Sequence, residues 1–316
     1  MPLRDRLLAL VVAVLWGVNF PATAFGLQHF PPLFMVAVRF TLIAVPTLLL
    51  VPRPQVPLRW FLGMGIGMGT VQFALLYLAM SIGMPSGLAS LVLQAAAPFT
   101  VLLGAVFLRE RLSGRQVVGV VAAVAGLTVI ALHRAVGGSA TALVPVLLTL
   151  AAGLGWAVGN LCSRQARAPK PLHLTLWMSV VPPLPLLVVS LLVEGPRRDW
   201  DSLRTASTWT ALPAVLGLLY IVLAATLVGY GLWNTLLSRN ASSVVAPFAM
   251  LVPVVGVLSS WLFFDEVPDR VELVAGVLVV GGVLYGSRSR RSPALPREES
   301  PGPVEPSLPG RNGARL

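Results

Sequence analysis

Long apolar runs, separated by short polar segments, recur along almost the whole chain. Each run is long enough to form a helix that crosses a hydrocarbon core of about 30 Å. We predict ten such helices, at about residues 7–27, 33–51, 60–82, 86–108, 116–133, 142–163, 172–193, 209–236, 243–264 and 271–287. The eighth is long enough that we expect it to tilt or to extend beyond the lipid. The pattern therefore predicts an all-α polytopic membrane protein.

The composition supports the lipid bilayer as the medium in which this chain folds. Of 316 residues, 56% are hydrophobic and 11% are charged, and the mean hydropathy is +0.83. A soluble domain carries about a quarter charged residues. The net charge of +11 comes from arginines in short loops and in the C-terminal tail, so it does not indicate a nucleic-acid partner.

The positive residues are unevenly divided between the two sides of the predicted bundle. Seventeen Lys and Arg fall on the side that carries both termini, and five fall on the other. Because Lys and Arg favour the cytoplasmic side of short loops, we predict that both termini are cytoplasmic. Residues 1–27 also resemble a secretory signal, but their apolar run is too long for one, and cleavage would break the alternation of sides. We expect them to remain as the first span.

The two halves of the chain resemble each other. Trp16 and Asn19 in the first predicted span have counterparts in Trp156 and Asn160 in the sixth, and Pro98 in the fourth has one in Pro253, about 155 residues later. Each half holds five spans, an odd number, so the second half enters the membrane from the opposite face. We predict two inverted repeats, residues 1–135 and 136–287. A proline-rich tail, residues 288–316, is expected to be disordered and cytoplasmic.

Several motifs resemble a known family. They are WGVNF at residues 16–20, Arg39-Phe40, and RERL at residues 109–112. On these residues the chain resembles the EamA-type transporters of the drug/metabolite transporter superfamily, over about residues 5–287. Residues 83–95, 228–233 and 251–256 resemble more narrowly the members that export amino-acid metabolites such as O-acetylserine and cysteine.

The resemblance implies a secondary transporter in the bacterial plasma (inner) membrane. Its expected action is export of small amino-acid-like molecules, such as cysteine, O-acetylserine or relatives, by alternating access. The alternative within the superfamily is a carrier of drugs or of other small metabolites. The expected partners are a small-molecule substrate and the lipid bilayer, and the sequence makes no prediction of oligomeric state.

The placement of the titratable residues argues against a membrane enzyme. Every Asp and Glu, and each of the three His, falls in a loop, in the tail or at the end of a span. An intramembrane enzyme needs a nucleophile with its base, an acid/base pair or a metal cluster at depth. We therefore expect no catalytic residue, no metal site and no cofactor.

A few polar and aromatic side chains lie at depth, and a substrate with both charges needs such groups in an otherwise apolar path. Interhelical packing is the alternative role for each of them. We also expect Trp16, Asn19 and Gln94 to face one central cavity. The predicted substrate-binding residues are Trp16, Asn19, Arg39, Tyr77, Gln94, Trp156, Asn160, Tyr230 and Trp233.

Arg39 is the one charge clearly inside a span, about six residues below the outer surface. A buried guanidinium must pair, face water or extend to the interface. The topology places Asp265, Glu266 and Glu272 at the same side of the membrane, so we expect one of these carboxylates to pair with Arg39 as a gate. Contact with a substrate carboxylate and simple extension to the interface are the alternatives.

Overall fold

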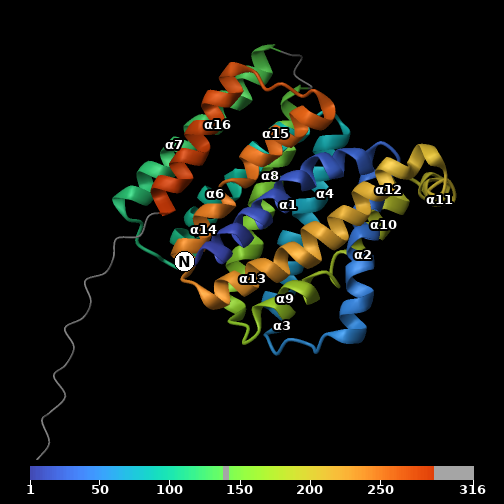
Figure 1. Cartoon of the computed structure of the whole chain (residues 1–316), viewed down its shortest axis with the longest axis horizontal. Helices are drawn as coiled ribbons and strands as arrows, with labels where there is room; N and C mark the ends of the chain where they lie inside the picture. The colour runs from blue at the N-terminus through green and yellow to red at the C-terminus, as the bar shows by residue number, and fades with distance from the viewer. Residues whose placement is uncertain (138–141, 288–316) are drawn as a thin grey trace, which may run out of the picture.

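The computed structural model describes residues 1–137 and 142–287, so the predicted tail lies outside the described residues. Its helices form one bundle, with α7 and α16 side by side at one edge (Figure 1). The helices are α1 Leu3–Leu27, α2 Pro32–Leu50, α3 Leu58–Met64, η1 Gly65–Val71, α4 Gln72–Ser81, α5 Ser86–Val92, η2 Leu93–Ala95, α6 Ala96–Phe107, α7 Gly114–Gly137, α8 Leu143–Ala166, α9 Pro171–Met178, α10 Pro183–Val193, α11 Pro196–Arg204, η4 Trp209–Ala211, α12 Leu212–Leu219, η5 Tyr220–Val228, α13 Gly229–Arg239, α14 Ser242–Ala249, α15 Val252–Phe264 and α16 Arg270–Ser287.

Ten helical segments of the described chain are long and apolar enough to cross a membrane. Their bounds lie within a few residues of the predicted spans, and the fold class is confirmed. The eighth segment, Trp209–Arg239, is the longest at 31 residues. We call the face that carries the start of α1 the N-terminal face and the other the opposite face.

Proline breaks the fourth and the ninth crossing at matched positions. A 3₁₀ turn, Leu93–Ala95, separates α5 from α6 just before Pro98, and α14 ends at Ala249 just before Pro253. Proline cannot donate to the carbonyl four residues earlier, so the helix is interrupted there. Both interruptions lie inside a membrane crossing.

The third and the eighth crossing each contain a π-helical stretch, η1 and η5. The Thr70 hydroxyl donates to the Gly65 carbonyl at 3.3 Å, and the Thr226 hydroxyl donates to the Ile221 carbonyl at 2.8 Å. Each threonine therefore uses a carbonyl five residues back. π-helical turns are rare and often mark functional sites.

The first crossing of each half packs against the other half in the same way. Helix α1 contacts α12, η5, α13 and α15, whereas α8 contacts α3, η1, α4 and α6. The π-helical stretch of each half thus lies on the first crossing of the other half. Polar groups on α1 and α8 consequently lie at the contact between the halves, where transporters place their substrate sites.

Candidate functional site

Arg39 lies on α2 and is 4% exposed, with its guanidinium enclosed by α4 and η5. One nitrogen, Nη1, donates to the Tyr77 hydroxyl at 2.9 Å, and Nη2 donates to the Thr226 hydroxyl at 3.3 Å. The guanidinium carbon also lies 4.0 Å from the centroid of the Phe73 ring. The aromatic face and two neutral hydroxyls offset part of the cost of burying this charge.

A polar chain extends from Arg39 to α1. The Tyr77 hydroxyl lies 3.5 Å from Thr23 Oγ1, and Thr23 donates to the Asn19 carbonyl at 2.8 Å. Tyr77 is fully buried and Thr23 is 1% exposed. Helices α1, α2 and α4 therefore meet at one connected polar network with η5.

Two atoms along this network are buried without a hydrogen-bond partner, Arg39 Nε and Asn19 Oδ1. The first is a charged donor and the second is a neutral acceptor. Buried polar atoms are normally paired, and each exception calls for an explanation. A carboxylate is a chemically suitable partner for the first atom, and an N–H donor is one for the second.

Three aromatic residues lie beside the network on α1 and α13. The Trp16 ring centroid is 5.2 Å from that of Tyr230 and 5.2 Å from that of Trp233. Trp16 Nε1 donates to the Ala225 carbonyl in η5 at 2.9 Å. This hydrogen bond holds α1 against η5 one residue before Thr226.

The other predicted residues are Trp156 and Asn160 on α8 and Gln94 in η2. Trp156 donates to Asn160 Oδ1 at 3.2 Å, and Asn160 donates to the Thr100 hydroxyl at 3.2 Å. Gln94 lies 3.9 Å from the Met250 sulfur, a long and weak contact. The structure thus separates the predicted residues into a group around Arg39 and Trp16 and a group around Asn160 and Gln94.

The expected pairing of Arg39 with a carboxylate is wrong in this conformation. Glu266 accepts hydrogen bonds from the N-terminus of α5, and Glu272 accepts one from Arg134 at 2.6 Å. Among the described residues, no carboxylate lies within ion-pair distance of Arg39. Arg39 instead extends inward to Tyr77 and Thr226.

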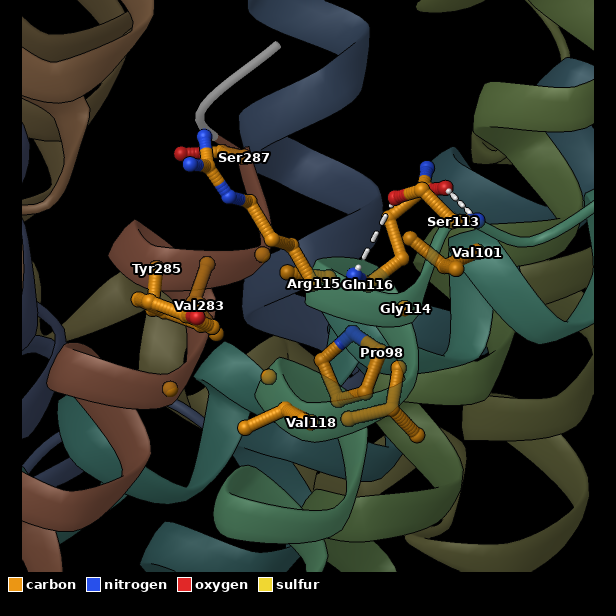
Figure 2. Close-up of a pocket in the computed structure, with 15 residues that line it drawn as sticks. Pro98, Val101, Ser113, Gly114, Arg115, Gln116, Val118, Val283, Tyr285 and Ser287 are labelled. Atoms are coloured by element: carbon orange, nitrogen blue, oxygen red, sulfur yellow. Dashed lines mark hydrogen bonds between the residues drawn. The ribbon is translucent and has the colours of Figure 1, made fainter. Parts of the chain in front are cut away.

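A cavity of about 930 Å³ lies at the N-terminal face, between α6, the start of α7 and the end of α16. Figure 2 shows Arg115 extending toward Ser287 on one side of the cavity, and Val101 close to Ser113 on the other. Trp16, Asn19 and Gln94, expected to share a cavity, are not among its lining residues. Its volume suits a small molecule.

An acidic cluster joins α10 and α11 at the opposite face. Ser190 Oγ lies 2.6 Å from Glu194 Oε2 and 2.8 Å from Asp199 Oδ2, and a single hydroxyl hydrogen cannot serve both carboxylates. Burial raises the pKa of the Asp199 carboxyl and Glu194 adds to the rise, whereas the Ser190 hydrogen bond and Arg198 lower it. Glu194 also accepts from two backbone N–H groups at the start of α2. The cluster fixes the helix that carries Arg39.

Sequence reasoning missed Phe73, Thr226 and Thr23 as partners within the Arg39 network. Thr23 lies four residues after Asn19, which is one helical turn, and this spacing was a usable signal. Thr226 stands in an apolar run with no feature that marks a π-helical stretch. Phe73 resembles any lipid-facing aromatic residue in the sequence alone.

The geometry defines a class: a polytopic helical membrane protein whose two halves pack reciprocally around buried polar groups. A solved crystal structure, 20% identical in sequence, shares the fold with a TM-score of 0.60 over 89% of this chain and 95% of its own.

The family model of the EamA-like transporter family matches residues 6–132 and again residues 143–287. The chain belongs to this family of transporters. It is 40% identical to a probable amino-acid metabolite efflux pump of Escherichia coli, over 92% of this chain and 98% of that protein. It is also 28% identical to a probable terminal-alkyne amino-acid exporter of Streptantibioticus cattleyicolor, over 91% and 95%.

Proposed function

We propose that this transporter exports small zwitterionic amino-acid metabolites, such as cysteine, O-acetylserine or relatives, by alternating access. The observation that carries the proposal is the pair of buried, unpartnered atoms Arg39 Nε and Asn19 Oδ1. A substrate carboxylate accepts from Arg39 and its ammonium donates to Asn19. The efflux-pump name of relatives about 40% identical to the chain supports the same substrate class.

The remaining predicted residues have supporting roles in this proposal. Tyr77 and Thr226 orient the guanidinium through their hydroxyls. Trp16, Tyr230 and Trp233 provide an apolar wall for the substrate side chain. Gln94 in η2 of the first repeat and Trp156 and Asn160 on α8 of the second repeat contact the substrate at a second place during transport. Export of drugs or other small metabolites is the alternative, supported by the apolar character of this wall.

We also propose the orientation and the division of the chain. The N-terminal face is cytoplasmic, because the positive residues gather there, and the membrane is the bacterial plasma membrane. The two repeats are residues 1–135 and 136–287. The 930 Å³ cavity then opens toward the cytoplasm, the side from which an exporter takes its substrate.

The test is transport by the purified full chain in liposomes. Uptake of labelled substrates is measured for a panel of amino acids, their O-acetyl derivatives and cationic drugs, with and without an imposed pH gradient. The proposal expects cysteine, O-acetylserine or a close relative to be transported. Transport of drugs alone supports the alternative, and transport of neither group contradicts both.

A further inference from the structure

The carboxylate of Glu266 holds the two repeats together at the opposite face. It accepts hydrogen bonds from the backbone N–H groups of Ser86 at 3.2 Å and Gly87 at 3.1 Å, and from the Ser86 hydroxyl at 2.9 Å. The first N–H groups of a helix lack partners within it and carry partial positive charge. Glu266, after the end of α15, therefore caps the helix that begins the fourth crossing.

Glu110 is the counterpart of Glu266 in the first repeat. Glu110 and Glu266 are as far apart in the sequence as Ser86 and Ser242, the first residues of α5 and α14. The same interval separates Arg109 from Asp265, the residues before each glutamate, which both adopt left-handed backbone conformations, with φ of 54° and 52°. The fourth crossing of the chain and its counterpart in the second repeat, the ninth, therefore begin and end alike.

The two glutamates nevertheless make different contacts. Glu110 accepts a hydrogen bond from Arg164 at the end of α8, and the two side chains are 44% and 52% exposed. The equivalent contact for Glu110 is the N-terminus of α14, at Ser242. Glu266 already occupies the corresponding position on α5.

The two faces of the bundle also differ in how their helices pack. The 930 Å³ cavity lies at the N-terminal face, beside Val101 of α6. At the corresponding place on the opposite face, Leu91 packs against Gly276, and Arg134 is paired with Glu272. The larger cavity therefore lies at the face where the glutamate is paired with an arginine, and a smaller one of about 370 Å³ lies beside the glutamate that caps a helix.

We propose that Glu266 and Glu110 are alternating locks. Glu266 caps α5 while the opposite face is closed, and Glu110 leaves Arg164 to cap α14 when the N-terminal face closes. This inference rests on the proposed alternating-access function and names the residues that alternate. In each lock the carboxylate moves between a position away from the helix, as Glu110 now has beside Arg164, and a helix N-terminus, as Glu266 now has on α5.

The test measures accessibility and needs no substrate. Val101 and Val257 hold corresponding positions in the two repeats, so Val101→Cys and Val257→Cys, each in a Cys162→Ser background, serve as reporters. A membrane-impermeant thiol reagent labels Val257→Cys in intact cells and Val101→Cys in inside-out vesicles. The ratio of the two labelling rates reports the balance between the two open states.

Each lock variant has an expected direction. Glu266→Gln keeps the shape but removes the charge, so the ratio of outer to inner labelling should rise about tenfold. Asp265→Asn is the matched control, because it removes a neighbouring carboxylate that makes no ion pair within the described residues, and should leave the ratio within about twofold.

The decisive comparison is between Glu110 and its present partner. Glu110→Gln removes the second lock and should lower the ratio, whereas Arg164→Gln frees Glu110 to cap α14 and should raise it. If both variants shift the ratio in the same direction, the proposal is overturned, because they then act only through their ion pair. An equal effect of Glu266→Gln and Asp265→Asn also overturns it. Should Glu266→Gln fail to insert, the Glu110 and Arg164 variants decide alone.

These outcomes are separable from the proposed function. If Glu110→Gln and Arg164→Gln shift the labelling ratio in opposite directions but the protein transports no amino-acid metabolite, the locks are supported and the proposed substrate class is contradicted. Amino-acid transport without opposite shifts supports the substrate and contradicts the locks.

Discussion

Replacement of Arg39 by glutamine should cost transport far more than stability. The variant loses two hydrogen bonds from the guanidinium, worth about 1 kcal/mol each within a membrane. It also loses the contact with the Phe73 ring, worth about 1–2 kcal/mol. Against this, burying a charged arginine at membrane depth costs about 2.5–3.5 kcal/mol. The terms nearly cancel, so the free energy of unfolding should change by no more than about 1–2 kcal/mol.

Arg39→Gln should reduce substrate affinity more than stability, because no favourable term compensates for the lost contact with the substrate. A charge-assisted contact with a substrate carboxylate contributes about 1.5–3 kcal/mol, which corresponds to roughly 10- to 150-fold in affinity. The melting temperature in detergent should therefore move by about 5 °C or less, while binding weakens at least tenfold. Tyr77→Phe is the matched control, because it keeps the buried ring and removes only the hydroxyl that orients Arg39.

The assay combines a thermal melt of the purified protein with equilibrium binding of labelled substrate. A fall of more than roughly 10 °C in melting temperature, with normal affinity per folded molecule, refutes the reasoning and makes Arg39 a packing residue. Tyr77→Phe should weaken binding by a smaller factor than Arg39→Gln. Equal losses in both variants indicate that the hydroxyl, and not the charge, contacts the substrate.

Three further perturbations have defined outcomes. Gly119→Ala should destabilise the α7–α16 pair, because the added Cβ meets the Gly282 carbonyl at 2.5 Å, and a lower melting temperature checks this. Asp199 has a raised pKa in the folded chain, so its contribution to stability is full below the ordinary pKa of 3.8 and is lost as the pH rises through the higher folded value. Asp199→Asn, which keeps a neutral side chain beside Ser190, should abolish this loss in melts recorded across that pH range. Cys162, the only cysteine and buried, should react with thiol reagents far more slowly in the folded protein than in denaturant, and rapid modification of the native protein contradicts its packing.

The ten crossings follow from the sequence because each apolar run must match the thickness of the bilayer. The breaks before Pro98 and Pro253 also follow, since proline interrupts the helix wherever it falls. The two π-helical stretches do not follow, because η5 lies within an apolar run and the alternating glycines of η1 favour close helix packing without specifying a π-helical turn. Local composition does not reveal a turn that depends on contacts with a distant helix.

The predicted pairing of Arg39 with a carboxylate is wrong for a related reason. The sequence indicates how deep Arg39 lies in its span, and Glu266 and Glu272 are predicted on the same side of the membrane. It does not give the rotation of α2 about its axis, which turns Arg39 toward Tyr77 and Thr226 instead. The N–H groups of α5 and the side chain of Arg134 already occupy the two carboxylates.

The most direct test of the proposed function is discrimination between substrates with and without a carboxylate. In liposomes that contain the wild-type chain or Arg39→Gln, uptake of a labelled amino-acid substrate is measured in competition with the same unlabelled amino acid or with its decarboxylated amine. The wild type should prefer the amino acid at least about tenfold, and Arg39→Gln should lose most of that preference. Equal competition by the amine against the wild type, or an undiminished preference in Arg39→Gln, contradicts recognition of a substrate carboxylate by Arg39.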